Sequence, residues 1–342
     1  MEAACVVAPP AVVGGHAVVV ACAVLVVDAG VRRSLADTAR LAKDADAAAP
    51  AGHLGAAAAL AMPFWSSALL LVVYFCWVDW VAVAAFAAVA LATTFSALEP
   101  FARHWLARPA LATRLAAVAS VGLVAAWVRT GHRRRHWLAV DAIGACSCVA
   151  LISAVDVPDL RVACVFLCGL GAYDVFWVFF SEELFGGNVM VEVAQRSAAN
   201  PAQGLAGAAF GSDFARNFAD ELPLPIKLLF PAGCGGFHVL GLGDIAIPGL
   251  LVSLAARFGV FVGDRGYRSL ALAAYAFGLS LASGAAELSA APQPALLYIV
   301  PCVLLPLAVY ARRRPHRRGT HLEMLWYGFE DEYDGGGEEH GP

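Results

Sequence analysis

Long runs of apolar residues alternate along the chain with short polar segments. A helix needs about 20 apolar residues to cross the ~30 Å hydrocarbon core of a bilayer. Nine runs are long enough, and together they make up about half of the chain. The pattern therefore predicts an all-α polytopic membrane protein with nine membrane-spanning helices. The predicted spans are Ala11–Val27, Leu54–Trp77, Val81–Leu98, Leu111–Val128, Leu138–Val155, Val162–Phe180, Phe237–Ala256, Leu270–Ala291 and Pro294–Tyr310.

The longest polar segments between the spans are residues 28–53, which carry mixed charge, and residues 181–236, which are interrupted by several prolines. We interpret both as connections, the second being the largest loop of the protein. Residues 319–342 are acidic and rich in glycine, and such a segment is expected to be mostly disordered. The sequence thus predicts one membrane domain over residues 1–318, followed by a tail.

The overall composition supports a membrane protein. Hydrophobic residues make up 60% of the chain and charged residues 15%, whereas soluble domains average about 45–50% and about 25%. Disorder requires the opposite balance, and so little polar surface cannot cover so large an apolar mass in water. The net charge of −4 also excludes the basic surface that nucleic-acid binding requires.

The cysteines do not indicate a disulfide framework or a metal site. Nine cysteines are an odd number, and most lie within apolar runs. Cys146 and Cys148, and likewise Cys164 and Cys168, are spaced like metal ligands but have no histidine nearby in the sequence. We interpret them as small buried residues, and expect no metal and no cofactor.

Lysine and arginine favour the cytoplasmic side of a membrane protein. With a lumenal N-terminus and a cytosolic C-terminus, 16 of the 23 basic residues lie on the cytoplasmic side. The run Arg133–Arg135 falls on the other side, and we interpret it as a contact with lipid headgroups.

Four acids interrupt the apolar spans: Asp141, Asp174, Asp244 and Glu287. A carboxylate in hydrocarbon costs several kcal/mol, so each acid is a functional candidate. Asp141 and Glu287 lie close to span ends, where a carboxyl group reaches the interface. We therefore read these two as polar residues near the headgroups.

Asp174 and Asp244 lie deeper, in spans that both adjoin the loop 181–236. With a rise of 1.5 Å per residue, their carboxyl groups should lie roughly 9 Å and roughly 10 Å from the same membrane face. Two neighbouring antiparallel helices would bring them to matching depth. The spacing therefore predicts that the two carboxyl groups pair.

Paired carboxyl groups in a site without bulk water cannot both ionise at low cost, so one keeps a proton. An acid beside a base suits peptide hydrolysis by an activated water. The sequence holds no HExxH motif or Ser/His/Asp arrangement that competes. Two other interpretations remain open: a proton-coupled transporter or channel, and a non-catalytic scaffold that binds membrane helices.

Residues beside the two acids suit such a site. Gly241 and Gly243 flank Leu242 and allow another backbone to approach Asp244. Tyr173 precedes Asp174, and its hydroxyl group either points at the site or lies at an interface. Pro294, Ala295 and Leu296 begin the last span on the same face, where a proline and a small residue permit close approach.

Taken together, these segments resemble the GxGD intramembrane aspartyl proteases, the family of presenilin and the signal peptide peptidases. The resemblance is strongest to the signal peptide peptidases and extends from about Val162 to Pro306. It rests on Tyr173-Asp-Val-Phe-Trp-Val-Phe179, Asn188-Val-Met190, Pro225-Ile-Lys-Leu-Leu-Phe-Pro231, Gly241-Leu-Gly-Asp-Ile-Ala-Ile-Pro-Gly249 and Gln293-Pro-Ala-Leu-Leu-Tyr-Ile-Val-Pro301.

The resemblance implies that Asp174 and Asp244 are catalytic, that Pro294–Leu296 shapes the site, and that residues 160–310 form the catalytic core. It further implies the nine-span fold, a lumenal loop over residues 181–236, and an endoplasmic reticulum membrane location with the N-terminus in the lumen. The implied substrates are type II-oriented membrane peptides, chiefly signal peptides. Membrane lipid is an expected partner, and assembly into a homo-oligomer is left open.

Two features extend or depart from the family pattern. Residues Ser181–Gly186 resemble an insertion. The extended segment Pro225–Pro231 suggests that Ile226, Lys227 and Leu228 hold an unwound substrate by strand pairing.

Overall fold

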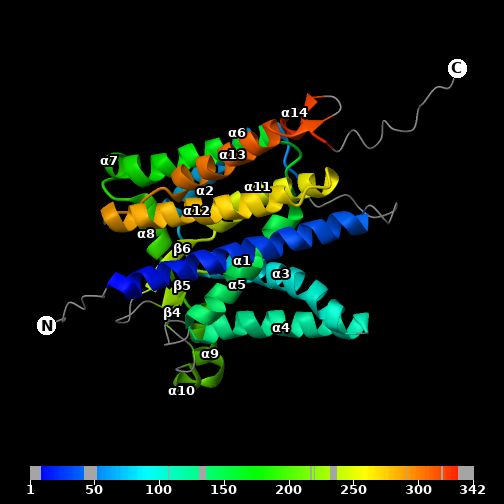
Figure 1. Ribbon diagram of the computed structural model, residues 1–342. Helices are drawn as coiled ribbons and strands as arrows, with labels where there is room; N and C mark the ends of the chain where they lie inside the picture. Colours follow the sequence, from blue (N-terminus) through cyan, green and yellow to red (C-terminus); the bar gives the residue numbers. More distant parts are fainter. Residues whose placement is uncertain are drawn as a thin grey trace. The chain divides into compact units, whose positions relative to one another are not determined.

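A computed structural model describes residues 9–41, 52–106, 108–130, 136–215, 218, 220–231, 237–289, 291–316 and 319–329 (Figure 1). The chain divides into two compact units. Unit 1 consists of Met1–Cys22, Ala68–Leu151 and Ser181–Gly243. Unit 2 consists of Ala23–Ser67, Ile152–Phe180 and Asp244–Pro342. The run Arg133–Arg135 and residues 330–342 of the predicted tail lie outside the described residues.

The predicted polytopic helical architecture is confirmed. Among the described residues, eight helices are long and apolar enough to cross a membrane. The first predicted span lies within a further helix, α1 (Pro9–Leu41). The eight are α2 (Ala56–Phe75), α3 (Asp79–Trp105), α4 (Pro109–Thr130), α5 (His136–Ala154), the continuous helix Leu160–Phe185, α11 (Gly243–Phe261), α12 (Gly266–Ser289) and α13 (Ala295–Arg312).

Two segments predicted as connections are partly helical. α1 continues to Leu41, well into the predicted connection 28–53. The segment Ser181–Gly186, which the sequence suggested as an insertion, largely forms α7 (Ser181–Phe185). α7 follows α6 (Leu160–Val175) and the π-helix η1 (Phe176–Phe180) without a break and lengthens the sixth span.

Unit 1 contains the antiparallel neighbours α3 and α4, with α9 and β3 packed against α3. The indole N–H of Trp127 donates to the carbonyl of Pro223 at 2.8 Å and joins α4 to β4. The buried core around this bond is almost entirely aliphatic. It consists of Val83, Ala90, Val124, Trp127, Ala139, Val140, Ile143, Ala198, Leu222 and Leu224.

Residues 181–236, predicted as one loop, contain several short elements instead. After α7 come α8 (Val189–Gln195), β3 (Ser197–Ala199), α9 (Pro201–Phe210), α10 (Ser212–Ala215), β4 (Glu221–Pro223) and β5 (Lys227–Pro231). β3 pairs antiparallel with β4. The side chains of Asn188 and Asn200 cap α8 and α9 by accepting backbone N–H bonds from Val191 and Ala202, at 3.1 Å each.

A β-hairpin precedes the seventh span. β5 pairs antiparallel with β6 (Phe237–Gly241), with Lys227 opposite Gly241 and Pro231 opposite Phe237. The prediction that a helix begins at Phe237 is therefore wrong, and α11 begins at Gly243. A short apolar run suits a buried strand as well as a helix, so its composition does not separate the two.

Unit 2 is built around α6, α11, α12 and α13. α13 packs against both α6 and α12, and Figure 1 shows these three helices side by side. A Cβ atom added at Gly278 of α12 would lie 2.9 Å from the Cα atom of Ile299 on α13. Glycine at this position therefore permits the two backbones to approach closely.

Short elements complete unit 2. β1 (Gly52–His53) pairs in parallel with β2 (Val155–Asp156), and β7 (Pro315–His316) pairs antiparallel with β8 (Gly319–Thr320). α14 (His321–Tyr327) follows and packs on α6 and α13. The start of the predicted disordered tail is thus ordered, because Leu325 and Phe329 bury their side chains.

A buried ion pair joins two segments of unit 2. Arg257 of α11 is 6% exposed and forms an ion pair with Asp156 of β2. Its guanidinium group also donates to the carbonyl of Val157 at 2.6 Å. Removal of one member of such a pair leaves the charge of its partner buried and uncompensated.

Replacing Arg257 with alanine is expected to lower the free energy of unfolding by about 3–5 kcal/mol. The measurement is unfolding of the purified full chain in detergent. The control is Arg103→Ala, which removes an exposed ion pair with Glu99 and is expected to cost about 1 kcal/mol or less. Equal losses in the two variants would contradict a special role for the Arg257 pair.

Candidate active site

Asp174 lies one residue before the end of α6, and its side chain is 5% exposed. The carboxylate oxygen Oδ2 accepts a hydrogen bond from the backbone N–H of Leu296 at 3.2 Å. Leu296 belongs to the first turn of α13, where backbone N–H groups have no partner within their own helix. Asp174 therefore caps α13 from a different helix.

The residues at the start of α13 explain why this cap comes from outside the helix. Pro294 occupies the N-cap position and offers no side-chain oxygen. The turn before it is held by Gln293, which donates to Ser289 Oγ at 3.0 Å and accepts from the Tyr298 hydroxyl at 3.1 Å. Pro294, Ala295 and Leu296 thus present an uncapped helix end to the carboxyl group of Asp174.

Asp244 lies in the first turn of α11. Pro248, four residues later, has no N–H, so the carbonyl of Asp244 lacks the usual donor in its own helix. The hydroxyl group of Tyr275, a buried residue of α12, donates to this carbonyl at 3.1 Å. A neighbouring helix therefore supplies the hydrogen bond that proline removes.

The two acids interact within unit 2. The two carboxyl groups lie close enough for the charge of Asp174 to act on the carboxyl group of Asp244. The expected depth of Asp244 relied on a helix that begins at Phe237. That arithmetic is wrong, since α11 begins at Gly243 and places Asp244 in its first turn.

The helix changes its winding two residues after Asp174. α6 passes into the π-helix η1, in which Trp177 is buried and donates from its indole N–H to Ser67 Oγ at 3.1 Å. Tyr173 is half-buried, with its ring centroid 6.4 Å from that of Trp177. Single π-helical turns are frequent at functional sites.

Gly241, Leu242 and Gly243 form the junction between β6 and α11. The N–H of Leu242 donates to the carbonyl of Ile226 at 3.2 Å and extends the hairpin beyond Gly241. The thiol group of Cys148 contacts the carbonyl of Leu242 at 3.7 Å. This junction ends one residue before Asp244.

The candidate substrate-binding residues Ile226, Lys227 and Leu228 belong to unit 1. Successive residues of a strand point their backbone N–H and C=O groups to opposite sides. The Ile226 carbonyl accepts a hydrogen bond from Leu242, directly after β6, so the backbone groups of Ile226 and Leu228 both face β6. The ammonium group of Lys227 donates to the carbonyl of Ala194 at 2.7 Å, and burial lowers its pKa. At Ile226 and Leu228, the expected pairing edge is therefore already used by β6.

Asp141 and Glu287 have different surroundings. Asp141 Oδ1 accepts the N–H of Leu229 at 2.7 Å, on the side of β5 that faces away from β6. This residue thus holds the hairpin, a role that its position near a span end did not indicate. Glu287 is exposed near the end of α12. Among the described residues, no group of three or more His, Cys, Asp or Glu side chains could hold a metal ion.

The fold and these residues define a polytopic helical membrane protein with two interacting acids on two helices of one unit. A family model described as "Signal peptide peptidase" matches residues 47–328. The chain therefore belongs to the signal peptide peptidase family, as its motifs predict.

Curated relatives carry related names. The chain is 36% identical over 254 residues to a signal peptide peptidase-like 1 protein of Oryza sativa subsp. japonica, covering 67% of this chain and 66% of that protein. It is 36% identical over 234 residues to signal peptide peptidase-like 1 of Arabidopsis thaliana, covering 62% and 60%. Identity to the signal peptide peptidase of Homo sapiens is 33% over 204 residues, covering 57% of this chain and 45% of that protein. No solved structure matches.

Tyr275 is the site residue that the sequence analysis missed. Two signals were available: a proline four residues after Asp244, and a tyrosine within an otherwise apolar span. Neither identifies a partner, since the tyrosine lies 31 residues further along the chain. Only the contact between α12 and α11 in the folded protein joins the two signals.

Tyr275→Phe is expected to lower the free energy of unfolding by about 1–3 kcal/mol, because the Asp244 carbonyl is left buried without a donor. Pro248→Ala restores a backbone N–H four residues after Asp244. In the Pro248→Ala background, the cost of Tyr275→Phe is therefore expected to shrink. Unfolding of the four proteins in a double-mutant cycle measures this coupling, and strictly additive effects would contradict it.

Proposed function

We propose that the protein is an intramembrane aspartic endopeptidase. Its substrates are the membrane spans of leftover signal peptides and of other type II-oriented membrane peptides. The observation that carries the proposal is the hydrogen bond from Leu296 to Asp174. It joins the segments Tyr173–Asp174 and Pro294–Leu296 within the unit that also holds Asp244. Membership of the signal peptide peptidase family supports the same activity.

The chemistry uses the two carboxyl groups as one acid–base pair. The ionised carboxylate takes a proton from a water molecule, whose oxygen attacks the carbonyl carbon of the scissile peptide bond. The protonated carboxyl group donates a hydrogen bond to the carbonyl oxygen. Transfer of a proton to the leaving nitrogen then breaks the C–N bond and restores the original protonation of the pair. No cofactor takes part.

A transmembrane helix hides its peptide bonds, so the substrate has to unwind before it is cut. The β5–β6 hairpin offers an edge that stabilises an extended segment. Asp141 already binds Leu229 on the outer side of β5, whereas Val239 and Gly241 point their backbone groups away from β5 on the outer side of β6. In our proposal, the unwound substrate pairs with the outer edge of β6.

A proton-coupled transporter and a helix-binding scaffold were the alternatives that the sequence left open. The family assignment supports a peptidase and gives no support to transport. Peptide cleavage separates the three functions directly, since neither a transporter nor a scaffold forms new peptide ends.

The protein spans a membrane several times. Within the proposal, that membrane is the endoplasmic reticulum membrane, with the N-terminus in the lumen and the C-terminus in the cytosol. Its partners are the surrounding lipid and the peptide substrates, and assembly into a homo-oligomer is left open.

Replacing either acid by asparagine is expected to lower the cleavage rate of a labelled signal peptide by at least about 10²-fold, since the acid–base pair is lost. The control is Glu287→Gln, which removes an exposed acid from another span and should leave the rate unchanged. A transition-state analogue of aspartic peptidases should inhibit the wild type. Unchanged cleavage by Asp174→Asn or Asp244→Asn would reject the proposal.

A second experiment tests the outer edge of β6. Val239→Pro removes an N–H that points away from β5, so the fold is expected to persist while cleavage slows by about tenfold or more. Leu240→Pro, the matched control, removes an N–H that faces β5 and is expected to destabilise the hairpin itself. Normal cleavage by a folded Val239→Pro protein would contradict substrate pairing at this edge.

A further inference from the structure

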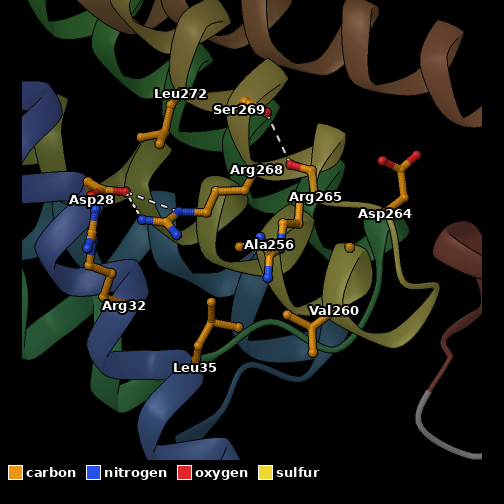
Figure 2. Close-up of a pocket in the computed structure, with 11 residues that line it drawn as sticks. Asp28, Arg32, Leu35, Ala256, Val260, Asp264, Arg265, Arg268, Ser269 and Leu272 are labelled. Atoms are coloured by element: carbon orange, nitrogen blue, oxygen red, sulfur yellow. Dashed lines mark hydrogen bonds and ion pairs between the residues drawn. The ribbon is translucent and has the colours of Figure 1, made fainter.

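A cavity of about 400 Å³ lies in unit 2 among α1, the end of α11 and the start of α12 (Figure 2). It contains none of the residues assigned to the proposed active site. Three arginines line it, namely Arg32 from α1 and Arg265 and Arg268 from the connection to α12 and its first turn.

One carboxylate lies among these arginines. Asp28 accepts from Arg32 at 2.7 Å and also forms an ion pair with Arg268. Figure 2 shows Arg268 reaching across the cavity to Asp28. Among the described residues, no carboxylate forms an ion pair with Arg265, which is exposed. Three guanidinium groups and one carboxylate leave the cavity with an excess of about two positive charges.

A second acid at the rim does not cancel this charge. Asp264 accepts from the N–H of Gly266 at 2.8 Å and from the hydroxyl of Tyr310 at 2.9 Å, and it lies 3.4 Å from Arg314. The Gly266 bond, followed by Tyr310 and Arg314, holds the pKa of Asp264 below its usual value. Figure 2 shows its carboxyl group turned away from the three arginines.

The remaining lining is apolar, and the cavity lies where helices leave the hydrocarbon region. Leu35, Val260 and Leu272 line it beside the arginines. α11 ends at Phe261 and α12 begins at Gly266, while Asp28 directly follows the first predicted span. The distribution of lysine and arginine along the sequence predicts that this end of α11 and α12 faces the cytoplasm. Anionic lipids are concentrated on that side of the membrane.

We propose that this cavity binds the phosphate group of an anionic phospholipid, with Arg265 and Arg32 as its ligands and an acyl chain against the apolar lining. Guanidinium groups bind phosphate oxygens through paired, charge-assisted hydrogen bonds. Arg268, fixed by Asp28, contributes charge at the back of the cavity. A zwitterionic lipid brings its own cation, so the excess positive charge of the cavity selects against it.

The test is native mass spectrometry of the full chain in a neutral detergent, titrated with phosphatidic acid. Phosphatidylcholine with the same acyl chains and inorganic phosphate are titrated in parallel. We expect saturable binding of phosphatidic acid, at least about tenfold tighter than binding of either other probe. Arg265→Gln is expected to weaken it about tenfold, as loss of one charge-assisted hydrogen bond predicts.

The matched control is Arg312→Gln, which removes an exposed arginine at the end of α13, outside the cavity. Binding by this variant should equal that of the wild type. If Arg265→Gln does not fold, Arg32→Gln tests the same cavity from α1. Equal weakening by Arg312→Gln, equal affinity for phosphatidylcholine, or equal affinity for inorganic phosphate would each overturn the lipid site.

Discussion

A backbone amide or carbonyl that lies among membrane-spanning helices has no water to bond, so every break in a helix needs a partner from elsewhere in the protein. Two such breaks occur beside the two acids. The uncapped start of α13 is bonded by the carboxyl group of Asp174, and the carbonyl that Pro248 leaves open is bonded by Tyr275. The other parts of unit 2 hold the donor and the acceptor of each of these two hydrogen bonds in place.

These two bonds connect the helical packing to the proposed chemistry. The donor from Leu296 is a main-chain group, so substitution of its side chain does not remove it. Asp174 consequently has one carboxylate oxygen, Oδ2, engaged with the protein backbone. Asp244, at the very beginning of its helix, lies at a helix end whose backbone N–H groups favour negative charge.

The sequence predicted the helical membrane architecture, because apolar runs of about 20 residues have few other uses. It also selected Asp174, Asp244 and Pro294–Leu296, which the structure places in one unit. It did not predict the β5–β6 hairpin, since five-residue apolar strands resemble the first turn of a span. The elements within 181–236 depend on asparagine caps and short pairings that carry little periodicity. Tyr275 was missed because its partner is a main-chain atom of a distant segment.

Gly278 has a consequence for how the site responds to change. It allows α12 to touch the backbone of α13 near Ile299, and each of these helices carries one of the bonds to the acids. Where two backbones touch in this way, no side chain lies between the helices to take up a change in their spacing. A displacement of the start of α13 toward α12 would therefore press directly on the helix that carries Tyr275, the donor to the Asp244 carbonyl.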